Sequence, residues 1–169
     1  KLSIWNIVMK IRTIRCHEIS EDINTVTLDE AELSAPADDE VQVKLMACAV
    51  NFPDILMIQG KYQFAPPLPF APGGEAAGIV VAVGDDIDDI SAGDRVVLGI
   101  RYGGFAEVVN APRETLQKIP DELSFEKAAA YKTTYLTSYV ALAIRGNLQP
   151  GETLLVLGAA GGVGTTAIE

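Results

Sequence analysis

The chain has 169 residues, 49% of them hydrophobic and 21% charged, which is ordinary for a globular protein with a buried core and excludes global disorder. The formal net charge of −10 at pH 7 argues against a nucleic-acid or anionic-membrane surface, because phosphate binding needs clustered Lys and Arg. Cys16 and Cys48 make no disulfide scaffold and fit a reducing, cytoplasmic setting. No run approaches the roughly 20 apolar residues of a membrane span.

The first two-thirds of the chain predict short strands separated by polar or glycine-containing turns. The expected strands cover residues 10–16, 25–33, 41–50, 76–83, 95–98 and 105–109. A short helix is predicted over 53–58 and ends at Gly60, and the prolines between Pro66 and Pro72 favour an extended loop. Strands at this spacing favour a small, partly closed barrel.

The pattern changes to helix, strand, turn and helix after Pro120. Ser124 is a predicted N-cap, and apolar spacing over 128–143 predicts a helix that Gly146 ends. The short apolar run 153–157 predicts a strand buried on both faces. We therefore expect a domain boundary near residue 120.

The strongest motif is the glycine-rich turn that follows this run and opens a helix. In the spacing G-x-G-x-x-G, Ala159, Gly161 and Gly164 fill the three small positions, and Ala in the first slot departs from the strict pattern. Glycine lets the backbone approach a diphosphate, and the helix start offers free N–H groups. Thr165 stands where a P-loop has Lys, and a purely structural glycine turn is the other alternative. The residues predicted to contact a dinucleotide are Ala159, Gly161, Gly162, Val163 and Gly164.

Five motifs occur in an order that resembles a known family. They are Ala47–Asp54 (ACAVNFPD), Ile58–Tyr62 (IQGKY), Pro69–Gly78 (PFAPGGEAAG), Gly93–Val96 (GDRV) and Ala159–Gly164 (AAGGVG). Together they resemble the medium-chain dehydrogenase/reductase superfamily, in its zinc-independent quinone oxidoreductase (zeta-crystallin-like) branch. The resemblance covers residues 9–169.

The resemblance implies a mostly β, GroES-like, partly open barrel followed by the truncated start of an α/β Rossmann domain. The expected domains are the barrel over 9–122 and the Rossmann start over 123–169. Residues 1–8 are an N-terminal extension whose native status the sequence leaves open.

The family match also implies an enzyme without a metal. By position, Asn51 stands where alcohol-dehydrogenase members have a zinc-binding Cys, and Gly74 stands where they have a His; neither is a useful zinc ligand. The adjacent pair Cys16 and His17 is no substitute, because neighbouring strand residues point to opposite faces. Glu75 matches the Glu of the zinc motif and is interpreted as structural, bonding backbone groups.

Three residues are candidates for the chemistry. Asn51 is either an amide donor beside the expected nicotinamide or simply an Asx turn or helix cap. Tyr62 resembles the proposed proton donor of enoyl-thioester reductases, and the alternative is a packed loop aromatic. Thr137 lies in a segment that resembles the one approaching the nicotinamide, and helix packing is its alternative; for Tyr139 we favour packing.

The resemblance implies hydride transfer from NADPH to a small-molecule quinone or other conjugated carbonyl. An enoyl-thioester reductase, or a non-catalytic NADPH-binding or structural homologue, are the alternatives. The residue that selects between NADH and NADPH falls beyond Glu169, about 20 residues past the turn. One strand and one helix cannot complete a doubly wound sheet, so the chain alone is expected to be inert. Homodimer formation at full length is left open.

Overall fold

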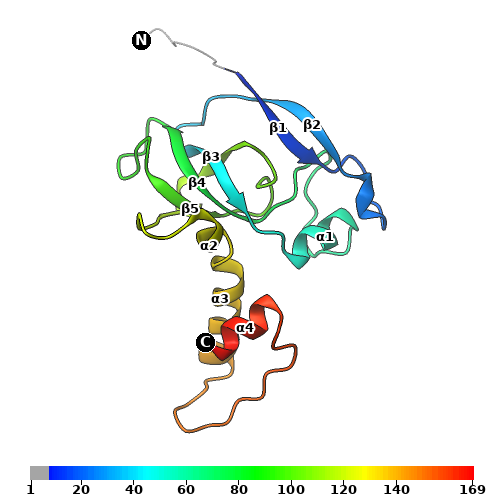
Figure 1. Ribbon diagram of the computed structural model, residues 1–169. Coiled ribbons are helices and arrows are strands. Elements are labelled where there is room, and N and C mark those ends of the chain that lie inside the picture. The colour runs from blue at the N-terminus through cyan, green and yellow to red at the C-terminus, as the bar shows by residue number, and fades with distance from the viewer. Residues whose placement is uncertain (1–7) are drawn as a thin grey trace. The chain divides into compact units, whose positions relative to one another are not determined.

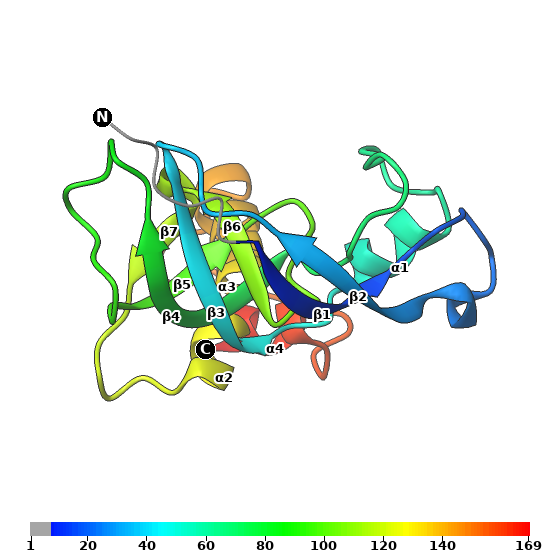
Figure 2. The ribbon, with the colours of Figure 1, turned by 90° about the horizontal axis from the view of Figure 1, so that it is seen from above.

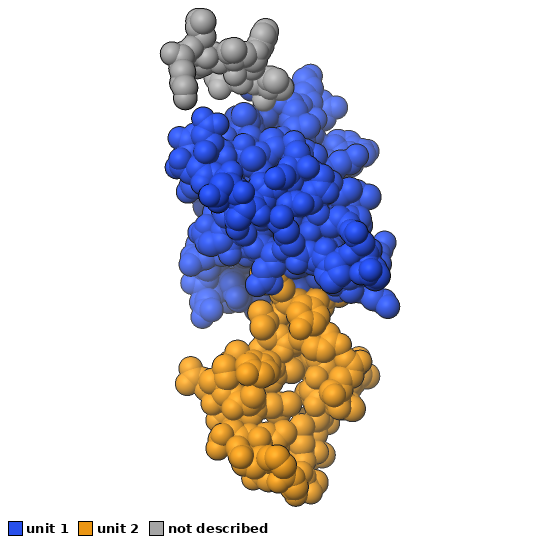
Figure 3. Space-filling model, turned by 90° about the vertical axis from the view of Figure 1, so that its left-hand side faces the viewer, with its two compact units in different colours: residues 1–129 blue, residues 130–169 orange. Residues whose placement is uncertain are grey.

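The computed structural model describes residues 8–169, which form two compact units, residues 8–129 and residues 130–169 (Figure 3). Each unit is described by itself. The proposed extension 1–8 lies outside the described residues, apart from Val8. No helix in the described part is long and apolar enough to cross a membrane.

The first unit is built from two antiparallel sheets (Figures 1 and 2). The smaller one pairs β1 (Met9–Arg15) with β2 (Thr27–Leu33). The larger one has the order β6-β3-β4-β5-β7, with β3 at Glu40–Cys48, β4 at Glu75–Val83, β5 at Arg95–Gly99, β6 at Val108–Pro112 and β7 at Leu116–Lys118. Single bridges Thr13–Ala106 and Cys16–Phe70 join the sheets, which gives the partly open barrel that the sequence predicts.

The main core lies against the larger sheet. Its buried members come from five strands and one loop: Val41, Val43, Ala76, Val80, Ile90, Val96, Leu98, Ala111 and Leu116. Ala77 and Val97 pack in a separate buried cluster, so both faces of the central strands are covered in part, and this burial of apolar surface supplies the driving force for closure.

Two features of the sheets differ from the prediction. The expected strand 105–109 instead begins at Val108, and the short β7 was not predicted. Residues 105–107 connect the two sheets, since Phe105 O accepts from Ile14 N at 2.8 Å and Glu107 O accepts from Leu45 N at 2.9 Å. Apolar periodicity does not separate a linking segment of this kind from the ladder that follows it.

The first unit also contains two helices and two 3-10 turns. Helix α1 spans Phe52–Ile58, and Gly60 follows it with φ of 66°, as a left-handed stop requires. Helix α2 spans Phe125–Ala129, and Ser124 caps it as predicted, since Ser124 Oγ accepts from Lys127 N at 3.3 Å. The 3-10 turns are η1 (Ile23–Thr25) and η2 (Arg113–Thr115).

The second unit contains α3 (Lys132–Tyr139), the π-helix η3 (Val140–Arg145) and α4 (Gly162–Ile168). The helix predicted over 128–143 is confirmed in part: it is interrupted by a turn at residues 130–131 and widens into a π-helix after α3. The helix does end at Gly146, whose N–H donates to Ala141 O at 2.7 Å, but Asn147 takes the left-handed conformation with φ of 48°.

The strand predicted over residues 153–157 is also wrong. These residues have no strand assignment, and Leu155 and Leu157 are 80% and 84% exposed. A parallel strand is held by neighbours on both sides, and the described residues supply none for this segment.

Candidate functional site

Asn51 lies where β3 has ended and α1 begins, and two backbone contacts fix its position. Asn51 N donates to Asp54 Oδ2 at 2.8 Å, and Asp54 N donates to Asn51 O at 3.0 Å. Asn at the N-cap and Asp three residues later are suited to this reciprocal arrangement, and Pro53 suits the first turn because it lacks an N–H. The sequence around Asn51 therefore builds a rigid helix start.

The side chain of Asn51 is directed to Glu75, the first residue of β4. Asn51 Nδ2 donates to Glu75 Oε2 at 3.3 Å, and Glu75 is only 1% exposed. The carboxylate of Glu75 therefore orients the amide of Asn51, and its predicted structural role through backbone groups stays a prediction. The cap interpretation and the amide-donor interpretation of Asn51 are compatible, because the backbone forms the cap and leaves the amide to Glu75.

Asp54 is a second buried carboxylate in the same cluster, with 2% exposure. Its Oδ1 accepts from Gly73 N at 2.9 Å, which ties α1 to the loop before β4. Burial raises the pKa of Asp54 above its ordinary value, and hydrogen bonds from the backbone N–H groups of Asn51, Gly73 and Gly74 oppose the rise. Sequence reasoning did not single out Asp54, although its position three residues after the N-cap is a signal for it.

Gly73 and Gly74 let a loop approach the cluster closely. Gly73 has φ of 100°, and a Cβ there would lie 2.7 Å from the ring of Phe105. A Cβ at Gly74 would lie 3.2 Å from Ile100 O, so the loop after β5 borders Gly74 directly. Gly74 leaves this position beside Glu75 without a side chain.

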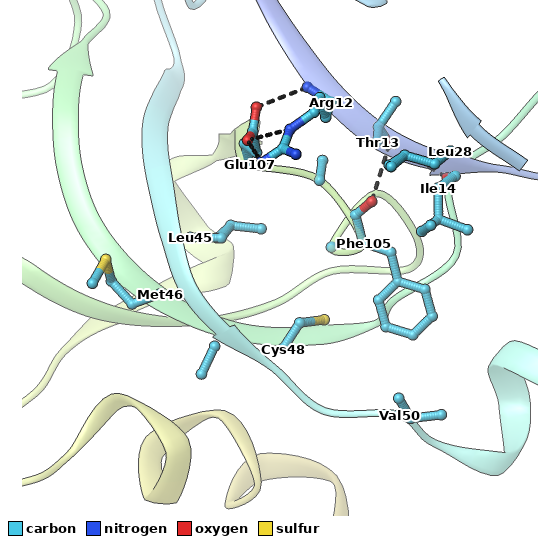
Figure 4. A pocket seen from close by; sticks show the side chains of 13 residues that line it. Arg12, Thr13, Ile14, Leu28, Leu45, Met46, Cys48, Val50, Phe105 and Glu107 are labelled. Carbon is cyan, nitrogen blue, oxygen red and sulfur yellow. Dashed lines mark hydrogen bonds and ion pairs between the residues drawn. The ribbon is translucent and has the colours of Figure 1, made fainter. Parts of the chain in front are cut away.

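A pocket of about 530 Å³ adjoins the cluster (Figure 4). Cys48 and Phe105 lie at the side of the pocket nearest Val50, and Arg12 forms a bidentate pair with Glu107 at the other side, with Arg12 Nε donating to Glu107 Oε1 at 2.8 Å. The lining between these ends is mostly apolar.

Cys48 connects the pocket with the carboxylate cluster. Its Sγ donates to Glu75 O at 3.1 Å, and burial followed by the nearby charge of Asp54 raises the pKa of this thiol to about 12. Cys48 is therefore a protonated, unreactive thiol at neutral pH.

The donor set around Asn51 does not fit zinc. Asn51 and Gly74 supply neither thiolate nor imidazole, and the thiol of Cys48 is held protonated toward a carbonyl. Within residues 8–169 no three His, Cys, Asp or Glu side chains gather as a metal cluster. Independence from zinc stays a proposal.

Tyr62 follows α1 in a loop held by main-chain bonds, with Tyr62 N donating to Leu56 O at 3.2 Å. Its half-buried ring packs against a small core of Cys16, Met57, Ile58 and Phe70. This packing supports the interpretation as a loop aromatic, and the proton-donor role stays a prediction.

The glycine-rich turn belongs to the second unit, and contact distances explain its glycines. Gly158 has φ of 68° and accepts from Gly161 N at 3.0 Å. A Cβ on Gly164 would lie 2.3 Å from Gly158 O and 2.8 Å from Ala159 Cα. The backbone therefore folds back onto the first turn of α4, and a residue larger than glycine at position 164 would prevent this. Gly158 is a fourth small residue of the turn, besides the three positions identified from the sequence.

Helix α4 is fixed to α3 by hydroxyl groups that sequence reasoning missed. Ser138, which is buried, donates from Oγ to Val163 O at 2.8 Å and shares a 2.7 Å hydrogen bond with Thr166 Oγ1. Thr166 Oγ1 also donates to Thr134 O at 3.2 Å. Ser, Thr and Gly at these positions give two helices with a close, polar contact.

Thr137 is exposed on α3, and its Oγ1 donates to Thr133 O at 2.5 Å. It lines an open pocket of about 610 Å³ with Leu136, Val140, Ala141 and Arg145. The structure thus groups Asn51 with Asp54 and Glu75 in the first unit, and describes Thr137 and residues 159–164 within the second.

The fold defines a GroES-like barrel followed by the start of a Rossmann domain. The model of the alcohol dehydrogenase GroES-like domain matches residues 37–121. The chain belongs to this family, within the medium-chain dehydrogenase/reductase superfamily.

Several known proteins are similar. The human synaptic vesicle membrane protein VAT-1 homolog is 45% identical over 135 residues, which is 80% of this chain and 34% of that protein. The quinone oxidoreductase-like protein 2 homolog of Nematostella vectensis is 42% identical over 160 residues, 94% of this chain and 43% of that protein. The solved Escherichia coli quinone oxidoreductase complexed with NADPH superposes with a TM-score of 0.83 at 36% identity, covering 93% of this chain and 48% of that one. The chain thus spans between a third and a half of the length of these relatives.

Proposed function

We propose that this chain is the acceptor-binding barrel and cofactor entry of an oxidoreductase that transfers hydride from NADPH to a quinone or another conjugated carbonyl, without zinc. The observation that carries the proposal is the side-chain amide of Asn51, which donates to the buried carboxylate of Glu75 beside a position that lacks a side chain, while the buried carboxylate of Asp54 holds the backbone N–H of Asn51. The similarity to quinone oxidoreductases supports the reaction class.

Asn51 supplies the polarising group in this proposal. Its Nδ2 carries two N–H groups, of which one is used by Glu75, and the other can donate to an acceptor oxygen that gains negative charge. Glu75 and Asp54 are positioning residues, because they fix the amide and the start of α1. A preorganised donor of this kind is worth about 10²–10³ in rate.

The second unit supplies the cofactor contacts in this proposal. NADPH would contribute the hydride, and its pyrophosphate would lie against Gly161, Gly162, Val163 and Gly164 at the start of α4, where the first N–H groups of the helix could donate to it. Ala159 would border the same turn, and Thr137 would contact the nicotinamide side. A Cβ on Gly164 would lie 2.3 Å from Gly158 O, so glycine is required for the tight turn that would bind the pyrophosphate.

The test uses the intact protein that carries this chain, with NADPH oxidation measured against phenanthrenequinone. We expect turnover in chelator-treated protein, and an Asn51→Ala variant about 10²–10³ slower. An Asn24→Ala variant, altered in the exposed η1 turn, is the matched control and should keep its rate. Full activity in Asn51→Ala would remove Asn51 from the mechanism.

The enoyl-thioester alternative rests on Tyr62. Replacing Tyr62 by Phe keeps the packing against Met57 and Phe70 and removes only the hydroxyl. A selective loss with a crotonyl thioester, while quinone reduction persists, would favour this alternative. If Tyr62→Phe reduces the quinone and the crotonyl thioester at the wild-type rates, Tyr62 is not a proton donor.

A non-catalytic role is the second alternative, and the human relative named as a vesicle membrane protein favours it. NADPH binding without reduction of any conjugated acceptor would support that role.

The oxidoreductase proposal has three further parts. They are a cytoplasmic location, a small-molecule acceptor as the principal partner, and a homodimer of the intact protein.

A further inference from the structure

The loop after β5 borders the candidate site through its backbone. Ile100 N donates to Gly74 O at 2.9 Å, and Arg101 O lies 3.9 Å from the position of a Cβ on Gly74. Arg101 is therefore attached to the same short segment that borders the open position beside Glu75. Its side chain plays no part in the chemistry described above.

The side chain of Arg101 rests on an aromatic surface. Its Cζ lies 5.1 Å from the centroid of the Phe64 ring, and Phe64 stacks with Tyr102 at 6.0 Å and an interplanar angle of 27°. Tyr102 in turn makes an edge contact with the buried Phe70. Phe64 packs against the same small core as Tyr62, so this surface is continuous with the second candidate residue.

The charge of Arg101 is not neutralised locally. Arg12, Arg95 and Arg113 each have a carboxylate partner within 4.0 Å, whereas Arg15, Arg101 and Arg145 form no such pair among residues 8–169, and of these three only Arg101 lies over an aromatic ring. Arg101 is exposed, and no Asp or Glu among residues 8–169 makes such a pair with it. In a protein of net charge −10, an exposed arginine held over an aromatic ring and left without a carboxylate is suited to binding an anion.

We propose that Arg101 is a specificity-determining residue that binds an anionic substituent of the acceptor, while Phe64 and Tyr102 contact its planar conjugated part. The acceptor class is therefore a planar quinone or enone that carries a carboxylate or sulfonate. The guanidinium lies over the Phe64 ring, with Cζ 5.1 Å from the centroid, and an arginine fork of N–H groups matches the two oxygens of such a group. The inference rests on the proposed function, since the acceptor reacts beside Asn51.

Binding measurements on the intact protein that carries this chain, made without NADPH, test the inference apart from turnover. The probes are an anthraquinone sulfonate and the corresponding neutral hydroxymethyl anthraquinone, titrated by calorimetry. Arg101→Gln should weaken sulfonate binding by about 10-fold or more, the ratio expected for a lost charge-assisted hydrogen bond. It should leave binding of the neutral probe unchanged. Lys127→Gln, which removes one exposed charge on α2, is the matched control and should change neither affinity.

Arg101→Lys provides a second variant, because it keeps the charge and loses the planar group. We expect it to bind the sulfonate with an affinity between those of wild type and Arg101→Gln. Absence of sulfonate binding to the wild type, an equal loss for both probes, or an equal effect of Lys127→Gln would each overturn the inference. Selective binding without NADPH oxidation by the intact protein would contradict the proposed function and leave the anion site standing.

Discussion

Replacing Asp54 by Asn tests whether the buried carboxylate organises the start of α1. Asp54 Oδ2 accepts from Asn51 N at 2.8 Å and Oδ1 accepts from Gly73 N at 2.9 Å, and the residue is 2% exposed. An Asn offers only one oxygen, so one of these N–H groups must face an NH₂ group. A hydrogen bond to a charged group contributes about 1.5–3 kcal/mol, and relief of the buried charge offsets part of the loss. We expect Asp54→Asn to lower the free energy of unfolding by about 1–2 kcal/mol.

Urea denaturation followed by circular dichroism measures this difference, with the exposed Asp88→Asn as the matched control. The control should stay within about 0.5 kcal/mol of wild type.

The stability difference between wild type and Asp54→Asn should also depend on pH. Because burial raises the pKa of Asp54, its contribution to stability is greatest below the ordinary value of roughly 3.9 and declines as pH rises through the raised pKa. The stability advantage of wild type over Asp54→Asn should therefore shrink between acidic and neutral pH. If Asp54→Asn is as stable as the control, or if the stability advantage of wild type grows with pH, Asp54 does not stabilise the start of α1 in the way described.

The remaining predictions concern the thiol and the second unit. Gly164→Ala should destabilise α4 by about 1–3 kcal/mol, seen as faster amide exchange, because its Cβ would lie 2.3 Å from Gly158 O. Gly161→Ala, whose Cβ would lie 3.4 Å from the same oxygen, should keep α4 protected, and equal protection in both variants would contradict the contact argument. Cys48, with a pKa of about 12, should resist iodoacetamide near pH 8 in the native chain and react in urea; rapid native labelling would show that the thiol is not held as described. Ser138→Ala should speed amide exchange in α4 by removing the bond to Val163 O, whereas unchanged exchange would assign α4 docking to other contacts.

Much of the barrel could be predicted from the sequence because its signals are local. Apolar alternation places β1, β3 and β4 within two residues of their observed ends, and Gly60 marks the end of α1 through its left-handed backbone. The displaced β6 shows the limit of this reasoning. Residues 105–107 have the composition of a strand, but their hydrogen bonds go to two different sheets, and only the tertiary arrangement decides that.

The prediction of a strand over residues 153–157 is wrong for a related reason. Its apolar composition is suited to a buried parallel strand, yet a strand exists only through its neighbours, and none is described for it. The glycine turn, in contrast, depends on contacts within about six residues, so its geometry forms locally.

Asn51 could be proposed from the sequence as a site residue, but the contacts that hold its side chain could not. Family motifs single out Asn51, whereas its bond to Glu75 joins residues 24 apart in sequence, and the bond between Ser138 and Val163 joins residues 25 apart. The position of Arg101 over Phe64 likewise depends on two loops that meet only in the folded barrel. Sequence patterns single out candidate site residues such as Asn51 more readily than the residues, such as Glu75, that fix their side chains in place.

The proposed hydride transfer from NADPH depends on Asn51 and not on zinc. A single turnover of the intact, chelator-treated protein tests this directly, with the nicotinamide absorbance followed after mixing with phenanthrenequinone. We predict oxidation of one NADPH per site, at a rate unchanged by added zinc and reduced about 10²–10³-fold in Asn51→Ala. NADPH that stays reduced with every conjugated acceptor, or activity that is lost on chelation and restored by zinc, would contradict the account.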